Sequence, residues 1–373
     1  MTIYYILIAA ASIYFFIISL SNILFLKRAT QAPSLREGPK ISVLIPARNE
    51  ENNIRQCLTS LLQQTYTNYD IIVLDDLSTD GTYDIVAEMA AEHGNLSIIK
   101  GEELPEGWYG KPHAMQQLSK HATGDFFLFT DADTIHSPES ISWAITNMLH
   151  HKADILSGYP HHTTEGFGED LVIPNIYVNT ILFLPLWMVP TTHIPLFSHA
   201  IGQYILFRRS SFEAIGGYEV ASHKITEDVY MAKAMKRRGF KVQFLDAKRY
   251  CSCRMYDGFR RAANGISKNI YDFFEQKLYP LIILVPFALL FFILPVALLV
   301  YQALIQGPHL FHAGISVGVF FITWAIAMID RKVKWYVIFL HPLMFLVLVG
   351  IAIKSVADGT LGRGYLWKGR FVR

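Results

Sequence analysis

The sequence predicts an α/β domain held between membrane-spanning segments at both ends of the chain. Of the 373 residues, 52% are hydrophobic, which exceeds the share typical of soluble domains. Long apolar blocks without charge gather near the two ends of the sequence. Between them, apolar strand-like runs alternate with helical patterns. That alternation is typical of a mainly parallel sheet that lies between helices.

The first element is an apolar segment at residues 2–26, which carries no charge and is long enough to cross a bilayer. Lys27 and Arg28 follow at once. A cleaved signal peptide would have a basic start, a shorter apolar core and small residues at its end, and this segment has none of these. We therefore predict an N-terminal transmembrane anchor at residues 1–28, with the following residues in the cytosol.

Residues 40–260 are expected to form the α/β domain. Strands are predicted at 41–47, 69–76, 96–101 and 126–129, and helices at 51–64 and 81–94. Ligands of such sheets bind beyond the carboxyl ends of the strands. Asp75-Asp76 and Asp131-Ala132-Asp133 both follow predicted strands, so we expect them at the same edge of the sheet.

The C-terminal region, residues 279–356, contains apolar blocks near 279–305, 313–329 and 335–353, and a basic tail follows at 357–373. Three full crossings would place the basic tail outside, against the positive-inside rule. One block is therefore expected to be a re-entrant or surface hairpin. The last block, interrupted by His341-Pro342, is the candidate.

Another apolar stretch, residues 171–197, lies inside the α/β domain and is broken by four prolines: Pro174, Pro185, Pro190 and Pro195. No piece of it reaches a spanning length. It is either buried core or a membrane-surface element near the site. The anchors on either side favour the surface element, with Trp187 at the level of the lipid headgroups.

Two carboxylates one residue apart, Asp131 and Asp133, follow the strand at 126–129. They repel each other unless something positive lies between them, and hard oxygen ligands suit Mg²⁺ or Mn²⁺. Asp-x-Asp alone is weak evidence for a metal. Three further motifs support it: "PARNEE" at 46–51, "EGWYGKPHA" at 106–114 with Lys111 on a glycine turn, and Thr226-Glu227-Asp228 at the start of a helix.

In this order and spacing, the motifs resemble the family 2 glycosyltransferases with the nucleotide-diphospho-sugar transferase (GT-A) fold, over about residues 40–260. The resemblance implies a nucleotide-diphosphate sugar as donor. The residues implied in donor binding are Pro46, Ala47, Glu50, Asp76, Lys111 and Asp131. Asp133, together with Asp131, would hold Mg²⁺ or Mn²⁺.

The resemblance also implies that Asp228 is the general base, with Glu227 and Arg254 on the acceptor and diphosphate side. A purely structural role for Asp228, as a partner of the helix dipole, is the alternative. Processive polysaccharide synthases of the family carry Gln-x-x-Arg-Trp, but here "CSCRMY" at 251–256 keeps only Arg254. That difference argues for transfer of a single sugar.

"WYGKPHA", "RMYDGF" and the tail "YLWKGRF" resemble lipid-glycosylating members, namely bacterial carotenoid (diaponeurosporenoate) glycosyltransferases and ceramide glucosyltransferases. The expected function is inverting transfer of one sugar, with UDP-glucose suggested as donor, to a carotenoid or ceramide-like membrane lipid. A polyprenyl-phosphate glycosyltransferase, a non-sugar nucleotidyltransferase and a non-catalytic membrane scaffold are the alternatives.

Composition limits the setting of this activity. The net charge of +2 gives no basic face for a nucleic-acid partner. The three cysteines are too few and too sparse for a disulfide framework, which fits a domain facing the reducing cytosol. We expect a multi-pass protein of the cell membrane with its catalytic domain in the cytosol.

Overall fold

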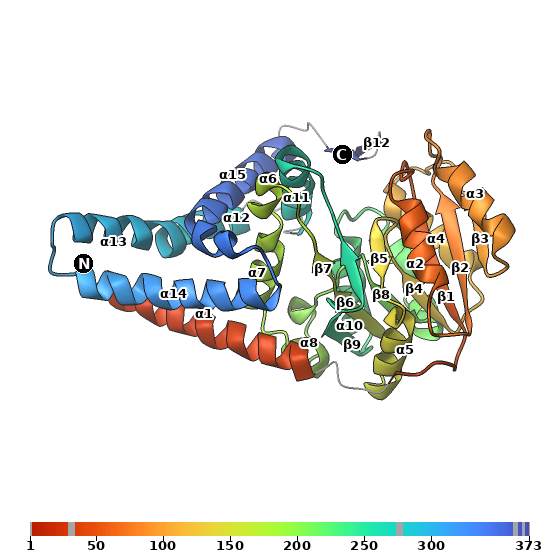
Figure 1. Ribbon diagram of the computed structural model, residues 1–373, viewed down its shortest axis with the longest axis horizontal. Coiled ribbons are helices and arrows are strands. Elements are labelled where there is room, and N and C mark those ends of the chain that lie inside the picture. Colours follow the sequence, from red (N-terminus) through yellow and green to blue (C-terminus); the bar gives the residue numbers. More distant parts are fainter. Residues whose placement is uncertain (1, 29–33, 274–278, 361–364, 368–369, 373) are drawn as a thin grey trace.

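A computed structural model describes residues 2–28, 34–273, 279–360, 365–367 and 370–372. Long helices gather at one end of the molecule and the strands at the other, as Figure 1 shows. The chain leaves the helical end once, builds the α/β domain, and returns to it for its last hundred residues.

The α/β domain is built on a seven-stranded sheet with the order β3-β2-β1-β4-β8-β6-β9. The strands are β1 (Ile41–Ala47), β2 (Tyr69–Asp75), β3 (Leu96–Lys100), β4 (Phe126–Phe129), β6 (Ile155–Tyr159), β8 (Ile205–Arg208) and β9 (Val242–Asp246). All neighbouring pairs are parallel except those of β8, which runs antiparallel to both β4 and β6. The predicted mainly parallel sheet is confirmed.

Helices cover both faces of this sheet because alternate strand residues point to opposite sides. Val43 packs with α2 (Ile54–Leu62), α3 (Thr82–Glu92) and α5 (Ser140–His150). Its neighbour Leu44 packs with α4 (Gly110–His121), α9 (Arg209–Ala214) and α10 (Glu227–Arg237). Both strand residues are fully buried, so the sheet is a two-sided core.

A second, three-stranded sheet has the order β5-β10-β7. Its strands are β5 (Thr134–His136), β7 (His161–His162) and β10 (Cys251–Cys253). The central strand β10 is antiparallel to β5 and parallel to β7. Since β5 starts directly after Asp133, this small sheet fixes one side of the Asp131–Asp133 turn.

At the helical end lie α1 (Thr2–Arg28), α12 (Tyr279–Ala288), the π-helical turn η3 (Leu289–Ile293), α13 (Leu294–Leu304), α14 (Leu310–Asp330), η4 (Trp335–Leu340) and α15 (His341–Thr360). Among the described residues, four stretches are long and apolar enough to cross a membrane: Ile3–Lys27, Leu281–Leu304, Leu310–Asp330 and Trp335–Thr360. Helices α1 and α14 run parallel and side by side, as Figure 1 shows. The Tyr5 ring lies 5.6 Å from His309 at one end, and Lys27 Nζ lies 3.6 Å from Asp330 at the other.

The last of these stretches has both ends against the α/β domain. Near its start, the Tyr336 hydroxyl bonds to Asp170 at the end of α6 (Phe167–Asp170). Near its end, the Ser355 hydroxyl donates to the Ser267 carbonyl in α11 (Phe259–Phe273), which packs on α6. Between them the Phe345 ring stacks 4.2 Å from Phe292 of η3, in the middle of another apolar helix. The path of η4 and α15 therefore enters the helical end and returns.

The stretch at 171–197 divides into two halves. Helix α7 (Pro174–Phe183) is mostly buried and packs on α1, where the Asn22 side chain bonds to the carbonyls of Ile181 and Leu184 at 2.8 and 2.7 Å. The second half, with α8 (Met188–Thr191) and η1 (Pro195–Phe197), exposes Trp187, Ile194 and Leu196, and Phe183 at the end of α7 is exposed beside it in sequence. Residues 171–197 therefore begin as buried core and end as an exposed apolar edge.

Two elements complete the fold: the 3₁₀ turn η2 (Gly217–Ala221), and a hairpin of β11 (Tyr365–Trp367) and β12 (Arg370–Val372). The rest of the predicted basic tail beyond Thr360 lies outside the described residues.

Candidate active site

The candidate site lies at the carboxyl ends of β1, β2 and β4, where the sequence predicted it. The ends of β1 and β2 are joined by a bond from the Asp76 amide to the Ala47 carbonyl, 2.7 Å long. The Arg48 guanidinium donates to the carbonyls of Asp76 and Leu77. Asn49 and Leu77 have φ of 52° and 55°, a conformation rare for such residues and often found at functional sites.

Lys111, in the first turn of α4, bridges two of the predicted carboxylates. Its Nζ lies 2.7 Å from Asp131 Oδ1 and 3.0 Å from Glu227 Oε1. Burial alone would lower the pKa of Lys111, but Asp131 and Glu227 raise it well above its ordinary value. The ammonium is therefore charged at any physiological pH. The positive group expected between Asp131 and Asp133 was Mg²⁺ or Mn²⁺; Lys111 is a cation of the protein itself that lies beside Asp131.

Asp228 lies in the first turn of α10, beside this bridge. Its Oδ2 accepts a hydrogen bond from the Gly202 amide at 2.8 Å, and its Oδ1 accepts one from the Val229 amide at 2.7 Å. Burial raises the pKa of Asp228 to about 7, and the charge of Glu227 adds to that rise. Lys111 and the two amides oppose it. A carboxylate with a pKa near 7 has the strength of a general base.

Thr226 precedes α10 as its N-cap residue, but its side chain does not cap the helix. The Thr226 hydroxyl instead donates to Asp272 Oδ2 of α11 at 2.8 Å. The same oxygen accepts the amides of Ile225 and Thr226 at 3.0 and 2.8 Å. Asp272 thereby fixes the turn that presents Glu227 and Asp228.

Asp133 has the surroundings of a cation ligand. Burial raises its pKa to about 7, and the charges of Asp131 and Glu50 add to the rise. Its Oδ1 is buried and has no hydrogen-bond partner within the described part of the chain. Three carboxylates in mutual repulsion fit a divalent cation with oxygen ligands. Among the described residues, no group of three or more His, Cys, Asp or Glu side chains is placed to hold a metal ion.

Comparison with known proteins identifies the domain. Residues 42–216 match the family described as Glycosyl transferase family 2. The chain carries a family 2 glycosyltransferase domain. It is a glycosyltransferase with the GT-A fold.

Two relatives support this assignment. The 4,4'-diaponeurosporenoate glycosyltransferase of Staphylococcus aureus (strain MRSA252) is 29% identical over 343 residues, which cover 88% of this chain and 87% of that protein. The enzyme of the same name from strain USA300 is 30% identical over 62% of this chain and 60% of that protein.

A solved structure supports the fold. A mannosyltransferase from Pyrobaculum calidifontis, in complex with GDP-Man and Mn²⁺, superposes with a TM-score of 0.53. It is 20% identical and covers 94% of this chain and 99% of its own. At that identity the likeness shows the shared fold, from the strands through the long helices.

The glycosyltransferase gathers most, but not all, of the predicted site residues. Those at the strand ends and around Lys111 are Pro46, Ala47, Glu50, Asp76, Asp131, Asp133, Glu227 and Asp228. Arg254 instead pairs with Glu165, Glu169 and Asp257, at 2.8, 2.9 and 3.3 Å. Trp187 lies at the exposed apolar edge before α8.

Several residues that build the site were not among the predicted site residues. Gly202 supplies an amide to Asp228, and a Cβ there would lie 3.0 Å from Lys111 Nζ. The thiol of Cys253 bonds to Asp133, and Tyr256 is half-buried near both. These three contacts join segments far apart in sequence, so only the fold reveals them.

Proposed function

We propose that the glycosyltransferase moves a single sugar, with inversion, from a nucleotide-diphosphate sugar to a carotenoid-type lipid in the membrane. The observation that carries the proposal is the cluster of Lys111, Asp131, Glu227 and Asp228 at the strand ends of a domain attached to long apolar helices. The names of the Staphylococcus aureus relatives support a carotenoid-type acceptor.

On the donor side, Asp76 with Pro46, Ala47 and Glu50 would hold the base and ribose, and UDP-glucose is the proposed donor. Lys111 would place its fixed positive charge against the diphosphate, since it stays protonated. Asp133 and Asp131 would hold Mg²⁺ or Mn²⁺, which when bound neutralises charge on the departing diphosphate.

On the acceptor side, Asp228 would take the proton. The acceptor oxygen forms a bond to the anomeric carbon while the bond from that carbon to the diphosphate oxygen breaks. The proton of an acceptor hydroxyl moves to an oxygen of Asp228, whose orientation the Gly202 amide fixes. Glu227 would act indirectly by holding Lys111.

The membrane arrangement follows from the helices. We propose that α1, α12–α13 and α14 cross the bilayer, that the α/β domain faces the cytosol, and that η4 and α15 form a re-entrant hairpin. The contacts of Tyr336 and Ser355 with the α/β domain support the hairpin. The exposed apolar edge with Trp187 would rest in the membrane surface beside the acceptor.

A direct test uses the purified full chain in lipid nanodiscs with a carotenoid acid or alcohol and a panel of radiolabelled nucleotide sugars. Transfer predicts label in the organic phase, attached to the carotenoid, with release of nucleoside diphosphate. Label found only as free sugar in the aqueous phase would contradict the proposal. Label on an added polyprenyl phosphate, lost in mild acid, would favour that alternative acceptor.

A further inference from the structure

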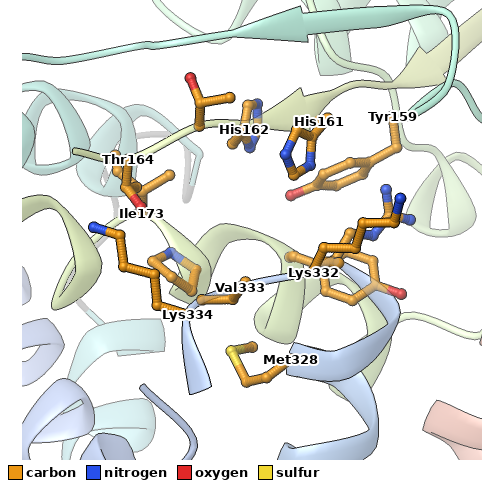
Figure 2. A pocket seen from close by; sticks show the side chains of 13 residues that line it. Tyr159, His161, His162, Thr164, Ile173, Met328, Lys332, Val333 and Lys334 are labelled. Carbon is orange, nitrogen blue, oxygen red and sulfur yellow. The ribbon is translucent and has the colours of Figure 1, made fainter. Parts of the chain in front are cut away.

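A cavity separate from the candidate active site lies where the α/β domain meets the end of α14. Its volume is about 160 Å³. Figure 2 shows His161 and His162 on one wall, and Lys332 and Val333 on the wall opposite. None of the candidate active-site carboxylates lines it, so the cavity is a separate site.

The lining of this cavity is basic. Three permanent cations, Arg331, Lys332 and Lys334, line it together with His161 and His162, and its described lining contains no carboxylate. Threonine hydroxyls and tyrosine rings complete the polar part of the wall. A concave basic surface without acidic side chains favours an anion.

Arg331 is the buried, fixed cation in the wall of the cavity. It is 5% exposed, and its guanidinium lies over the rings of Tyr177 and Tyr159, 4.0 and 4.7 Å from their centres. Its Nη1 pairs with Asp246 at 3.0 Å, yet its buried Nη2 has no hydrogen-bond acceptor within the ranges that the structure describes. A buried guanidinium nitrogen without an acceptor calls for an oxyanion.

The other basic side chains of the cavity differ in how they are paired. Lys334 Nζ is 3.0 Å from Asp170 Oδ2, so its charge is largely compensated. Lys332 is exposed and adopts a φ of 56°, and no ion pair to it is found in the described part of the chain. Burial lowers the pKa of His161, and the positive charges of Arg331 and Lys332 lower it further. Arg331 also has its Nε 3.5 Å from Asp330 Oδ2, so Lys332 is the cation that leaves the cavity with uncompensated positive charge.

We propose that this cavity binds the phosphate headgroup of an anionic membrane phospholipid. Arg331, Lys332 and Lys334 follow directly after the apolar helix α14, so the cavity lies at the level where a spanning helix leaves the bilayer. There, anionic headgroups meet juxtamembrane basic residues. The site takes this lipid whatever the sugar acceptor is, so it does not depend on the proposed transfer reaction.

The cavity is also connected to the candidate active site. His162 Nε2 lies 2.9 Å from Gln203 Oε1, and Gln203 follows Gly202, whose amide bonds to Asp228. The Gln203 carbonyl accepts the Thr130 hydroxyl at 2.9 Å, one residue before Asp131. A bound headgroup would stabilise this chain of contacts, so we expect the lipid to increase transfer as well as to bind.

The test compares Lys332→Gln with the matched control Arg260→Gln. Arg260 is an exposed cation on α11, outside the cavity, so the control measures general attraction to a charged membrane. The full chain is placed in phosphatidylcholine nanodiscs with increasing phosphatidylglycerol, and native mass spectrometry counts the retained phosphatidylglycerol. One basic contact corresponds to about fivefold in affinity. We expect about fivefold weaker retention for Lys332→Gln and no change for Arg260→Gln.

A second variant, His161→Asn, keeps a polar wall and should weaken retention in the same direction. Equal loss in Lys332→Gln and Arg260→Gln would overturn the proposal, because surface charge alone would then explain binding. In a separate arm, inorganic phosphate is added to pure phosphatidylcholine nanodiscs. Thermal stabilisation by phosphate equal to that by phosphatidylglycerol would overturn the lipid assignment and show a site for free phosphate. Lipid retention measures binding alone. Failure of the proposed sugar transfer would therefore leave the retention result unchanged, and the two proposals can fail separately.

Discussion

Replacing Asp228 by Asn tests the chemistry of the site most directly. The amide oxygen of Asn can still accept the Gly202 amide, whereas its NH₂ group cannot accept the Val229 amide and Asn cannot take a proton. Loss of a general base lowers the rate by about 10²–10⁴-fold, or about 3–5 kcal/mol in the activation free energy. We expect kcat to fall by this amount with a hydroxyl acceptor, while donor binding stays within about twofold of the wild type.

The pH dependence gives a second, independent readout of Asp228. Its pKa is raised to about 7, and only the deprotonated carboxylate can act as a base. The wild-type rate should therefore rise with pH through about 7 and level off above it. In Asp228→Asn that inflection should be absent. Single-turnover rates at saturating donor, measured between pH 5.5 and 9, check both profiles.

The acceptor decides how large the effect is. A carotenoid carboxylic acid has a pKa near 4 and is already ionised, so it needs no base and its transfer should be nearly insensitive to Asp228→Asn. Its product is an ester that mild alkali cleaves, whereas a glycoside made from an alcohol survives alkali. If the Asp228→Asn variant transfers sugar to an alcohol acceptor at the wild-type rate, the assignment of Asp228 as the general base is refuted. Lost donor affinity with retained turnover would instead show that Asp228 binds the donor.

Four further outcomes are expected. Asp133→Asn or EDTA should abolish turnover with the melting temperature retained; full activity in EDTA would exclude the metal. Gly202→Ala places a methyl group 3.0 Å from Lys111 Nζ, so kcat should fall by about tenfold or more without unfolding, measured against thermal stability. In intact cells, an impermeant maleimide should label Gln306→Cys but not Thr360→Cys, because α15 returns to the side of the α/β domain. The native cysteines are buried and should give no background labelling. Trp187→Glu should impair lipid transfer but spare donor hydrolysis; equal loss of both would mean that this edge is ordinary core.

Strands β1 and β4 were predictable because each is a short apolar run buried on both faces. The prediction for β1 at 41–47 is confirmed residue for residue, and so is that for β4 at 126–129. Helix α2 starts three residues later than predicted, because the Asn53 amide bonds back to the Glu50 carbonyl in a turn. The antiparallel insertion of β8 between β4 and β6 is a non-local pairing, and no local pattern encodes it.

The site was predictable by residue type and only partly by contact. Asp131 was indicated by a motif at the end of a strand, since parallel strands bring their carboxyl ends together, and Asp228 by a motif at the start of a helix. The partners of these residues come from elsewhere: Gly202 lies 26 residues before Asp228, and Asp272 lies 46 residues beyond Thr226. Arg254 was expected at the acceptor side from its motif alone, whereas its neighbours Glu165 and Glu169 hold it by charge.

Lys111 explains how several carboxylates can share one buried edge of the sheet. Its single charge lies within 3.0 Å of both Asp131 and Glu227, and therefore offsets one of their two negative charges. Asp133 is left with Asp131 and Glu50 as negative neighbours, and burial together with these charges raises its pKa. A second positive charge would be most stabilising beside Asp133 and least beside Lys111. Asp133 and Asp131 would therefore hold a bound cation, which would neutralise charge on the diphosphate, while Lys111 would contact the diphosphate and Asp228 would serve the acceptor.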